Sequence, residues 1–209
     1  MTPKRSISAT SRMAVLAAAV SAATLLGACA PLIVGGAMVG TALAVTDRRT
    51  SGAQLEDQAI ELKSINRVRE AAGSGANVSV TSYNRTVLLT GEVASEAARV
   101  AAEQAVARIE NVRATVNELA VMGTTTLSAR SNDAILSSKV KAAFVDAKDL
   151  QANAFKVVAE RGTIYLMGRV TEREANRATE LARATSGVGK VVKVFEILTE
   201  AELAALQAK

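Results

Sequence analysis

The only cysteine of this 209-residue chain, Cys29, lies in a sequence that points to chemistry on its thiol. The small residues Gly27 and Ala28 precede it, and the longer segment Met13–Leu26 before them is apolar. Three basic residues and no acidic one lie before that segment: Lys4, Arg5 and Arg12. Charge, an apolar run and small residues, in this order, are typical of a secretory signal peptide. We therefore predict a signal peptide over residues 1–28 and a cut before Cys29, whose thiol can then carry a lipid through a thioether.

The residues around Cys29 resemble the lipobox of bacterial lipoproteins, in which the cysteine is acylated and becomes the first residue of the mature chain. The resemblance implies lipid attachment at Cys29 and a tether over residues 29–54. Residue 30 is alanine rather than aspartate, and similarity to sorting in Gram-negative lipoproteins then implies the outer membrane, with the domains facing the periplasm. A second interpretation stays open. Met13–Val45 carries no charge and is long enough for an uncleaved membrane-spanning helix, although glycines and a proline interrupt it.

The rest of the chain repeats itself. Thr86–Val93 aligns with Thr163–Val170, and a helical pattern and a valine-rich strand follow each of them. Each copy is predicted as helix, strand, strand, helix, strand, over residues 55–122 and 132–199. Two helices on one face of a three-stranded sheet make each copy a small α+β domain. The segments outside the copies are a polar linker, residues 123–131, and a tail, residues 200–209.

Several positions carry predictions about local structure. Gly91 and Gly168 occupy the same place in the two copies, and we predict that each ends a strand where the chain turns toward its helix. Asp57 and Asp133 are predicted to open the first helix of each copy. The T-x-x-E motif in Thr171–Glu174 predicts a capping box at the start of a later helix.

The repeated unit resembles the BON domain through its T-[VI]-x-L-x-G-x-V strand, the alanine-rich helix after it and the closing valine-rich strand. The resemblance covers residues 55–199 in two copies. With a lipobox and a tether, the layout is similar to dual-BON-domain outer-membrane lipoproteins of the division-associated, phospholipid-binding kind. Thr46–Thr50 and Ser131–Ile135 make the likeness closer. The resemblance implies that the second domain docks on anionic phospholipid through its first helix, and that the protein supports outer-membrane integrity.

The first helix of the second domain, predicted from about Asn132 to Val145, is compatible with such docking. Its apolar stripe toward the sheet is Leu136, Val140, Ala143 and Phe144. We predict a phospholipid-binding face of one apolar residue off that stripe and three cations around it: Ile135, with Arg130, Lys139 and Lys141. The family resemblance implies an aromatic residue at the place of Ile135, so binding is expected to be weaker here. The alternative is that Ile135 packs under the linker and the lysines form a solvated surface.

Composition argues against other classes of function. The chain has no histidine, its one thiol is assigned to lipid, and no cluster of ligands or glycine-rich phosphate loop is present, so we expect no enzyme, no metal and no cofactor. Removal of residues 1–28 leaves 22 basic and 20 acidic residues, too even a balance for nucleic-acid binding. The remaining alternative is an adaptor for envelope proteins. The first domain suits that role better, because its first helix has Ala59 at the place of Ile135, among acidic residues: Glu56, Asp57 and Glu61.

Overall fold

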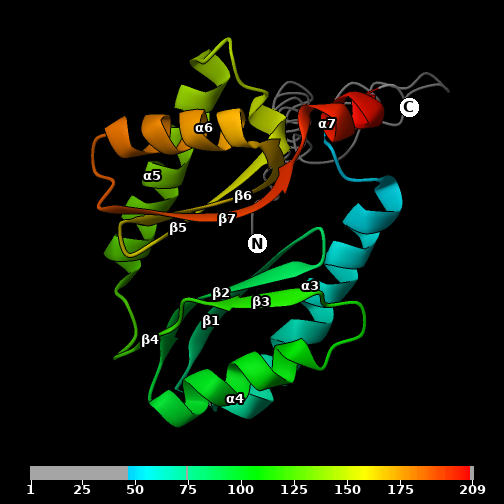
Figure 1. Cartoon of the computed structure of the whole chain (residues 1–209). Coiled ribbons are helices and arrows are strands. Elements are labelled where there is room, and N and C mark those ends of the chain that lie inside the picture. The colour runs from blue at the N-terminus through cyan, green and yellow to red at the C-terminus, as the bar shows by residue number, and fades with distance from the viewer. Residues whose placement is uncertain (1–46, 74, 208–209) are drawn as a thin grey trace, which may run out of the picture. The chain divides into compact units, whose positions relative to one another are not determined.

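The computed structural model describes residues 47–73 and 75–207, and both copies of the repeat lie in this part of the chain (Figure 1). The first copy consists of α3 (Ser51–Ala72), β1 (Asn77–Tyr83), β2 (Thr86–Val93), α4 (Glu96–Ala107), β3 (Ala114–Asn117) and β4 (Ala120–Val121). The second copy consists of α5 (Leu127–Asp146), the 3-10 helix η2 (Ala152–Ala154), β5 (Phe155–Glu160), β6 (Thr163–Thr171), α6 (Glu172–Ala184) and β7 (Lys190–Leu198), and α7 (Glu200–Gln207) follows it. The predicted α+β fold and the repeated helix–strand order are confirmed.

The two sheets share one topology. In each, the first two strands form an antiparallel hairpin, and the third strand pairs parallel with the middle strand, giving the orders β1-β2-β3 and β5-β6-β7. The short strand β4, which the sequence did not predict, also pairs with β2. It is separate from β3 because the Asn117 side chain accepts a hydrogen bond from the Leu119 amide at 3.2 Å, and Leu119 turns into the core.

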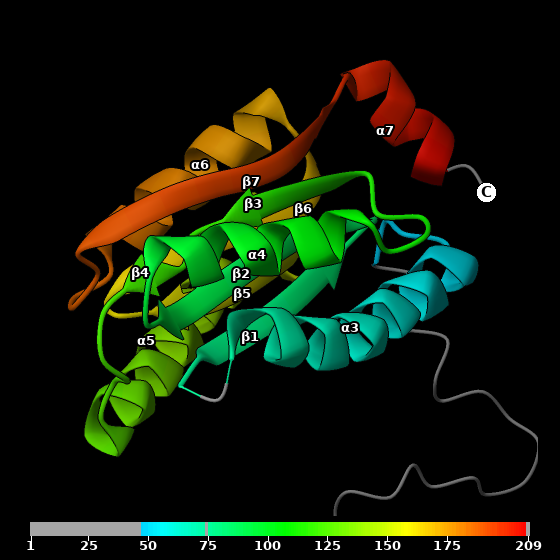
Figure 2. The ribbon, with the colours of Figure 1, turned by 90° about the horizontal axis from the view of Figure 1, so that it is seen from below.

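Each sheet has a helical layer on one face (Figure 1), and Figure 2 looks onto α3 and α4 of the first copy. Alternate residues of the middle strand point to that layer. In the first copy Val87, Leu89 and Val93 join a core with Ile60 of α3 and Val106 of α4. The second core has the same plan with more aromatic content, and Phe155 contacts two other rings, at centroid distances of 5.1 and 6.0 Å.

The opposite faces of the two sheets meet each other. Four buried side chains from both copies form one cluster between them: Tyr83, Leu88, Tyr165 and Met167. Leu88 and Tyr165 occupy equivalent positions in the repeat. Because β2 and β6 are covered on both faces, they are buried almost throughout, which explains the unbroken apolar stretches Val87–Leu89 and Ile164–Met167 in their sequences.

A buried aspartate supports the hairpin of each copy. The Asp57 carboxylate accepts hydrogen bonds from the amides of Asn84 and Arg85 at 2.8 and 2.7 Å, and Asp133 accepts from the amides of Arg161 and Gly162 at 2.8 and 2.9 Å. All four turn residues have positive φ, from 48° to 70°, as a tight two-residue hairpin turn requires. Burial alone would favour the protonated acid, but these bonds and others from Ser82 and Arg49 keep the pKa of Asp57 below its usual value.

The predicted helix starts at Asp57 and Asp133 were wrong. Helix α3 begins at Ser51 and α5 at Leu127, and each has a threonine cap: Thr50 accepts from the Ala53 amide at 3.1 Å, and Thr126 from the Ala129 amide at 3.3 Å. The aspartates lie inside the helices because their carboxylates are used on the hairpins. The predicted capping box of α6 is present.

Gly91 and Gly168 lie inside β2 and β6 rather than at their ends. Gly91 has a φ of 113°, and a Cβ atom there would lie 2.0 Å from the carbonyl oxygen of Asn77. A Cβ atom at Gly168 would lie 2.6 Å from the carbonyl oxygen of Ala154. Both positions therefore need glycine, because the backbone of β1 at Gly91 and the end of η2 at Gly168 pass too close for any side chain.

Candidate functional site

Helix α5 presents a buried side and an exposed side, and its start explains which residues reach the surface. Leu136, Val140 and Phe144 are buried against the sheet, as the apolar stripe predicted. The helix begins at Leu127, five residues before the predicted Asn132, so the predicted linker contains its first turn. Asn132 and Asp133, at the predicted start, lie within the helix, because the Thr126 hydroxyl caps its first turn by accepting from the Ala129 amide.

The structure places Ile135 on the surface, with 55% of its area exposed. It therefore does not pack under the linker. Lys139 and Lys141 are exposed as well, on either side of the outward face. Arg130 is exposed, but its guanidinium folds back and donates to the carbonyl of Thr125 at 3.3 Å.

Two further apolar residues lie on this face that the sequence analysis missed. Leu127 and Val145 are 79% and 71% exposed. They are eighteen residues apart, five full turns at about 3.6 residues per turn, so they lie on one side of α5. With the helix start placed at Asn132, Leu127 fell in the linker and the spacing could not be seen. The carboxylates of α5 are the buried Asp133 and Asp146 in its last turn, so acidic charge is absent from most of this face.

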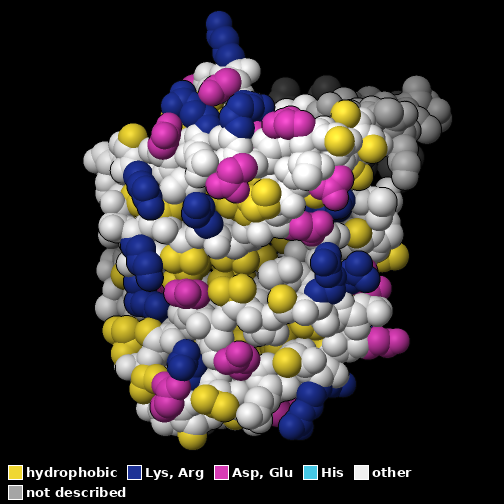
Figure 3. Space-filling view, in the orientation of Figure 1, with side chains coloured by type: hydrophobic (Ala, Val, Ile, Leu, Met, Phe, Trp, Pro, Cys, Tyr) yellow, Lys and Arg dark blue, Asp and Glu magenta, His cyan; other side chains and the backbone are white. Residues whose placement is uncertain are grey.

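Charge over the wider surface is mixed. The face of the molecule in Figure 3 carries Lys and Arg side chains interspersed with Asp and Glu, with apolar patches between them. Any attraction of α5 to anions therefore depends on the local group of cations rather than on a broad basic surface.

A cavity of about 380 Å³ borders Ile135 and Lys139. The hairpin turn of the second copy closes another side of it through Arg161 and Gly162, and Gly187 adds the loop after α6. Among the residues that the structure describes, no carboxylate forms an ion pair with Lys139, so its ammonium group faces this cavity and the solvent without a fixed counter-ion.

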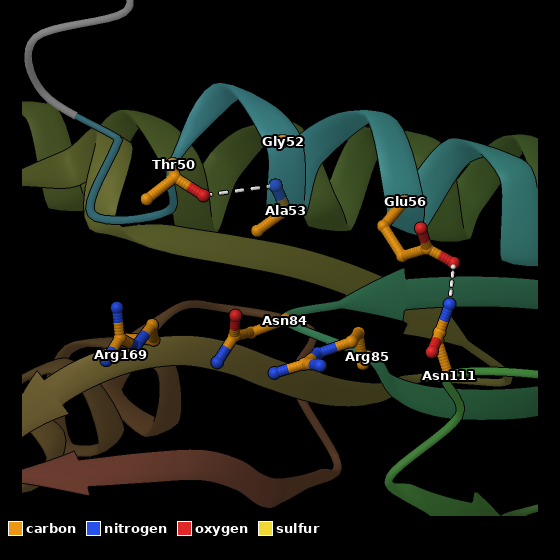
Figure 4. Close-up of a pocket in the computed structure, with 8 residues that line it drawn as sticks. All are labelled: Thr50, Gly52, Ala53, Glu56, Asn84, Arg85, Asn111 and Arg169. Atoms are coloured by element: carbon orange, nitrogen blue, oxygen red, sulfur yellow. Dashed lines mark hydrogen bonds between the residues drawn. The ribbon is translucent and has the colours of Figure 1, made fainter.

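A second cavity, of about 470 Å³, lies at the equivalent place in the first copy (Figure 4). The first turn of α3, the hairpin turn Asn84–Arg85 and Asn111 line it, and Arg169 enters from the second copy. This cavity was not predicted, because nothing in the sequence alone places Arg169 and Arg85 at the same cavity.

The segment before α3 contacts both copies of the repeat. Arg48 is buried and its guanidinium donates to both oxygens of Glu174 at 2.7 Å, in the second copy. Arg49 pairs with Asp57 of the first copy at 2.9 Å and lies 4.2 Å from the ring centroid of Tyr83. Residues 47–50, here called the strap, therefore contact both domains.

Charged pairs also join the copies directly. Lys156 contacts Glu61 at 3.0 Å, and Arg161 contacts the fully buried Glu92 at 3.2 Å. Glu61 was expected to make the first helix unfavourable for anionic lipid, and in the structure it faces the other domain. Asp57, cited in the same expectation, is buried and adds no surface charge.

The BON domain family matches this chain twice, over residues 56–123 and 132–199. The chain belongs to the BON-domain family. It is 37% identical over 186 residues to outer membrane lipoprotein DolP of Haemophilus influenzae, which covers 88% of this chain and 95% of that protein. It is 29% identical to the 21 kDa hemolysin of Actinobacillus pleuropneumoniae, over 71% of this chain and 78% of that protein. A solved structure of CdsD from Chlamydia trachomatis aligns with 69% of this chain and 97% of its own, at 10% identity and a TM-score of 0.29.

Some predictions about the site fall outside the part that the structure describes. Cys29, the signal peptide and most of the tether lie there, as does the alternative membrane-spanning segment. Among the described helices, none is both long and apolar enough to cross a bilayer.

Proposed function

We propose that this BON-domain protein is held at the outer membrane by lipid on Cys29, faces the periplasm, and binds anionic phospholipid through α5 in support of envelope integrity. The observation that carries the proposal is the outward face of α5. It exposes Leu127, Ile135 and Val145, and lysines lie on both flanks. Exposed apolar side chains beside cations suit an interface with anionic headgroups, where each cation adds on the order of 1 kcal/mol. The similarity to an outer membrane lipoprotein supports the membrane assignment.

Vesicle binding tests the α5 face. Residues 30–209, which lack the lipidated cysteine, are expected to bind phosphatidylglycerol vesicles in low salt and to bind phosphatidylcholine vesicles much less. Ile135→Glu is expected to weaken binding by about tenfold or more, because it removes roughly 2 kcal/mol of apolar burial and adds a repelled charge. Leu62→Glu is the matched control, since Leu62 on α3 is 69% exposed. Equal binding by the Ile135 and Leu62 variants would rule out α5 as the docking face.

A second candidate function is a protein adaptor that uses α3. Leu55, Leu62 and Ile65 are exposed to 68%, 69% and 44%, and the first two lie two turns apart on one side of the helix. Charges of both signs are exposed on the same helix, on Lys63, Arg69 and Glu70, which suits a protein surface better than anionic lipid. On this alternative, Leu62→Glu loses a partner that co-purifies from solubilised envelopes, while Ile135→Glu retains it.

A further inference from the structure

The cavity at the start of α3 carries chemistry that the proposed membrane docking does not use. Three of its walls come from the first copy and one from the second, so a bound molecule would contact both domains. It lies away from the exposed face of α5, since no residue of α5 lines it. Its volume of about 470 Å³ is large enough for a small molecule rather than only a single ion.

One part of the cavity is basic. The backbone amide of Arg85 donates a hydrogen bond to Asp57, and its carbonyl accepts one from the amide of Arg113. Among the described residues, none accepts a hydrogen bond from the Arg85 guanidinium. Arg169 uses Nε for Glu196 and Nη1 for the carbonyl of Arg48, which leaves Nη2 available. Arg85 therefore supplies a whole guanidinium group without a fixed acceptor, and Arg169 supplies one nitrogen beside its fixed pair with Glu196. Such donors recognise phosphate and carboxylate groups.

The other part of the cavity is suited to hydroxyl groups. The Asn111 amide donates to Oε1 of Glu56 at 3.0 Å, and this pair lies at the opposite end of the view from Arg169 (Figure 4). A carboxylate oxygen and an amide oxygen accept from hydroxyl groups and repel a second anion. The cavity thus separates anion donors at one end from hydroxyl acceptors at the other.

Unusual backbone conformations gather at the same place. Four described non-glycine residues have positive φ, and three of them line this cavity: Asn84, Arg85 and Asn111. The equivalent cavity of the second copy has Gly162 and Gly187 at the places of Arg85 and Asn111. The first copy therefore has an arginine and an asparagine at two positions where glycine would avoid the backbone strain of a positive φ.

We propose that this cavity binds a small phosphate ester of a polyol, with the phosphate between Arg85 and Arg169 and the hydroxyl groups at Glu56 and Asn111. The same phosphate and polyol chemistry occurs in a free ester and in the headgroup of a phospholipid. Both sources would place the ligand at the seam of the two domains.

The test is a titration of the full chain, labelled with ¹⁵N and held in a neutral detergent, followed by NMR. With sn-glycerol 3-phosphate, the signals of Asn84, Arg85 and Asn111 are expected to shift and saturate, while glycerol alone leaves them unchanged. Arg85→Gly copies the residue of the second repeat, so it removes the guanidinium without adding backbone strain. It is expected to weaken binding about tenfold, as loss of a charge-assisted contact does. Arg67→Gln, at an exposed position of α3, is the control and should bind as the native chain does.

A second series uses the same detergent with added phosphatidylglycerol. Shifts at the cavity with the soluble ester, or only with the phospholipid, both support the proposal and identify the source of the phosphate. No shift with either ligand, or equal affinity of the native chain and Arg85→Gly, overturns it. Ile135→Glu should leave these shifts intact, so failure of the α5 face and failure of this cavity give different results.

Discussion

Arg48 shows how a single residue decides where a chain segment lies. Its side chain is 4% exposed and meets Glu174, 126 positions away, through two hydrogen bonds of 2.7 Å. The same carboxylate caps α6 by accepting from the Thr171 amide at 3.0 Å. Burial opposes ionisation, but the bonds from Arg48 and Thr171 keep the pKa of Glu174 below its usual value. Loss of the Arg48 guanidinium would leave the buried Glu174 carboxylate without its counter-ion, so this pair fixes the position of the strap.

Replacement of Arg48 by Met is expected to lower the free energy of unfolding by about 3 kcal/mol, because Glu174 is left buried and unpaired. Urea unfolding measures the loss. Adding Glu174→Gln to Arg48→Met should recover part of it, since a neutral amide costs less to bury. Arg177→Met is the control: its ion pair with Asp149 is 41% and 50% exposed, so its loss should cost less than about 1 kcal/mol. Similar losses in the two single variants would contradict a structural role for the strap.

At the scale of elements, the two hairpins show what sequence spacing could and could not predict. The strands and their order followed from apolar patterns that are local to each segment. The helix starts did not, because Asp57 and Asp133 are good capping residues whose real partners lie in hairpins 27 and 28 residues away. Because the helix start was placed at Asn132, Leu127 was assigned to the linker and its spacing from Val145 was missed. Hydrogen bonds between residues far apart in the sequence leave no periodic pattern from which they could be predicted.

Gly91 is the element-scale position with the clearest steric demand. Gly91→Ala is expected to destabilise the fold by roughly 3 kcal/mol, because its Cβ would overlap the Asn77 carbonyl and its φ of 113° is unfavourable for alanine. Thermal unfolding followed by circular dichroism would detect the loss. Gly123→Ala serves as the control, since a Cβ there meets nothing within 4 Å. If both variants unfold at the native temperature, the close approach of β1 to β2 is wrong.

At the scale of the whole molecule, the two copies of the repeat carry opposite charges at equivalent positions, where their sheets meet. The glycine of each middle strand is followed by Glu92 in one copy and by Arg169 in the other. Glu92 pairs with the hairpin residue Arg161 of the second copy, and Arg169 lies beside the hairpin of the first. Self-comparison predicted the copies and used their difference at Ala59 and Ile135 to assign them different partners, but it did not predict that Glu92 and Arg169 lie where the copies meet.

The seam also gathers carboxylates whose pKa values move in opposite directions. Burial would raise the pKa of Glu92, but hydrogen bonds from Thr125, Asn77 and Arg161 lower it below its usual value. Glu160 lies nearby, and burial and then the charge of Glu92 raise its pKa. Glu92 therefore contributes stability above its unfolded pKa, and this contribution is lost as the pH falls through its folded pKa. Glu160 contributes in the opposite sense: it favours the fold at low pH and opposes it once the pH exceeds its raised folded pKa.

Glu160→Gln should separate these two effects. At pH 7 the variant removes a charge that opposes folding, so we expect its unfolding temperature to exceed that of the native chain by about 2–4 °C, as a gain of about 1 kcal/mol gives in a chain of this size. As the pH falls through the folded pKa of Glu160, the native side chain takes up its proton and the difference should begin to shrink, and it should be gone below the unfolded pKa of this group. Glu180→Gln on α6 is the control, because Glu180 is 69% exposed. A Glu160 variant that is less stable than the native chain at pH 7 would mean that Glu160 binds Arg161 at the seam strongly enough to outweigh its burial next to Glu92.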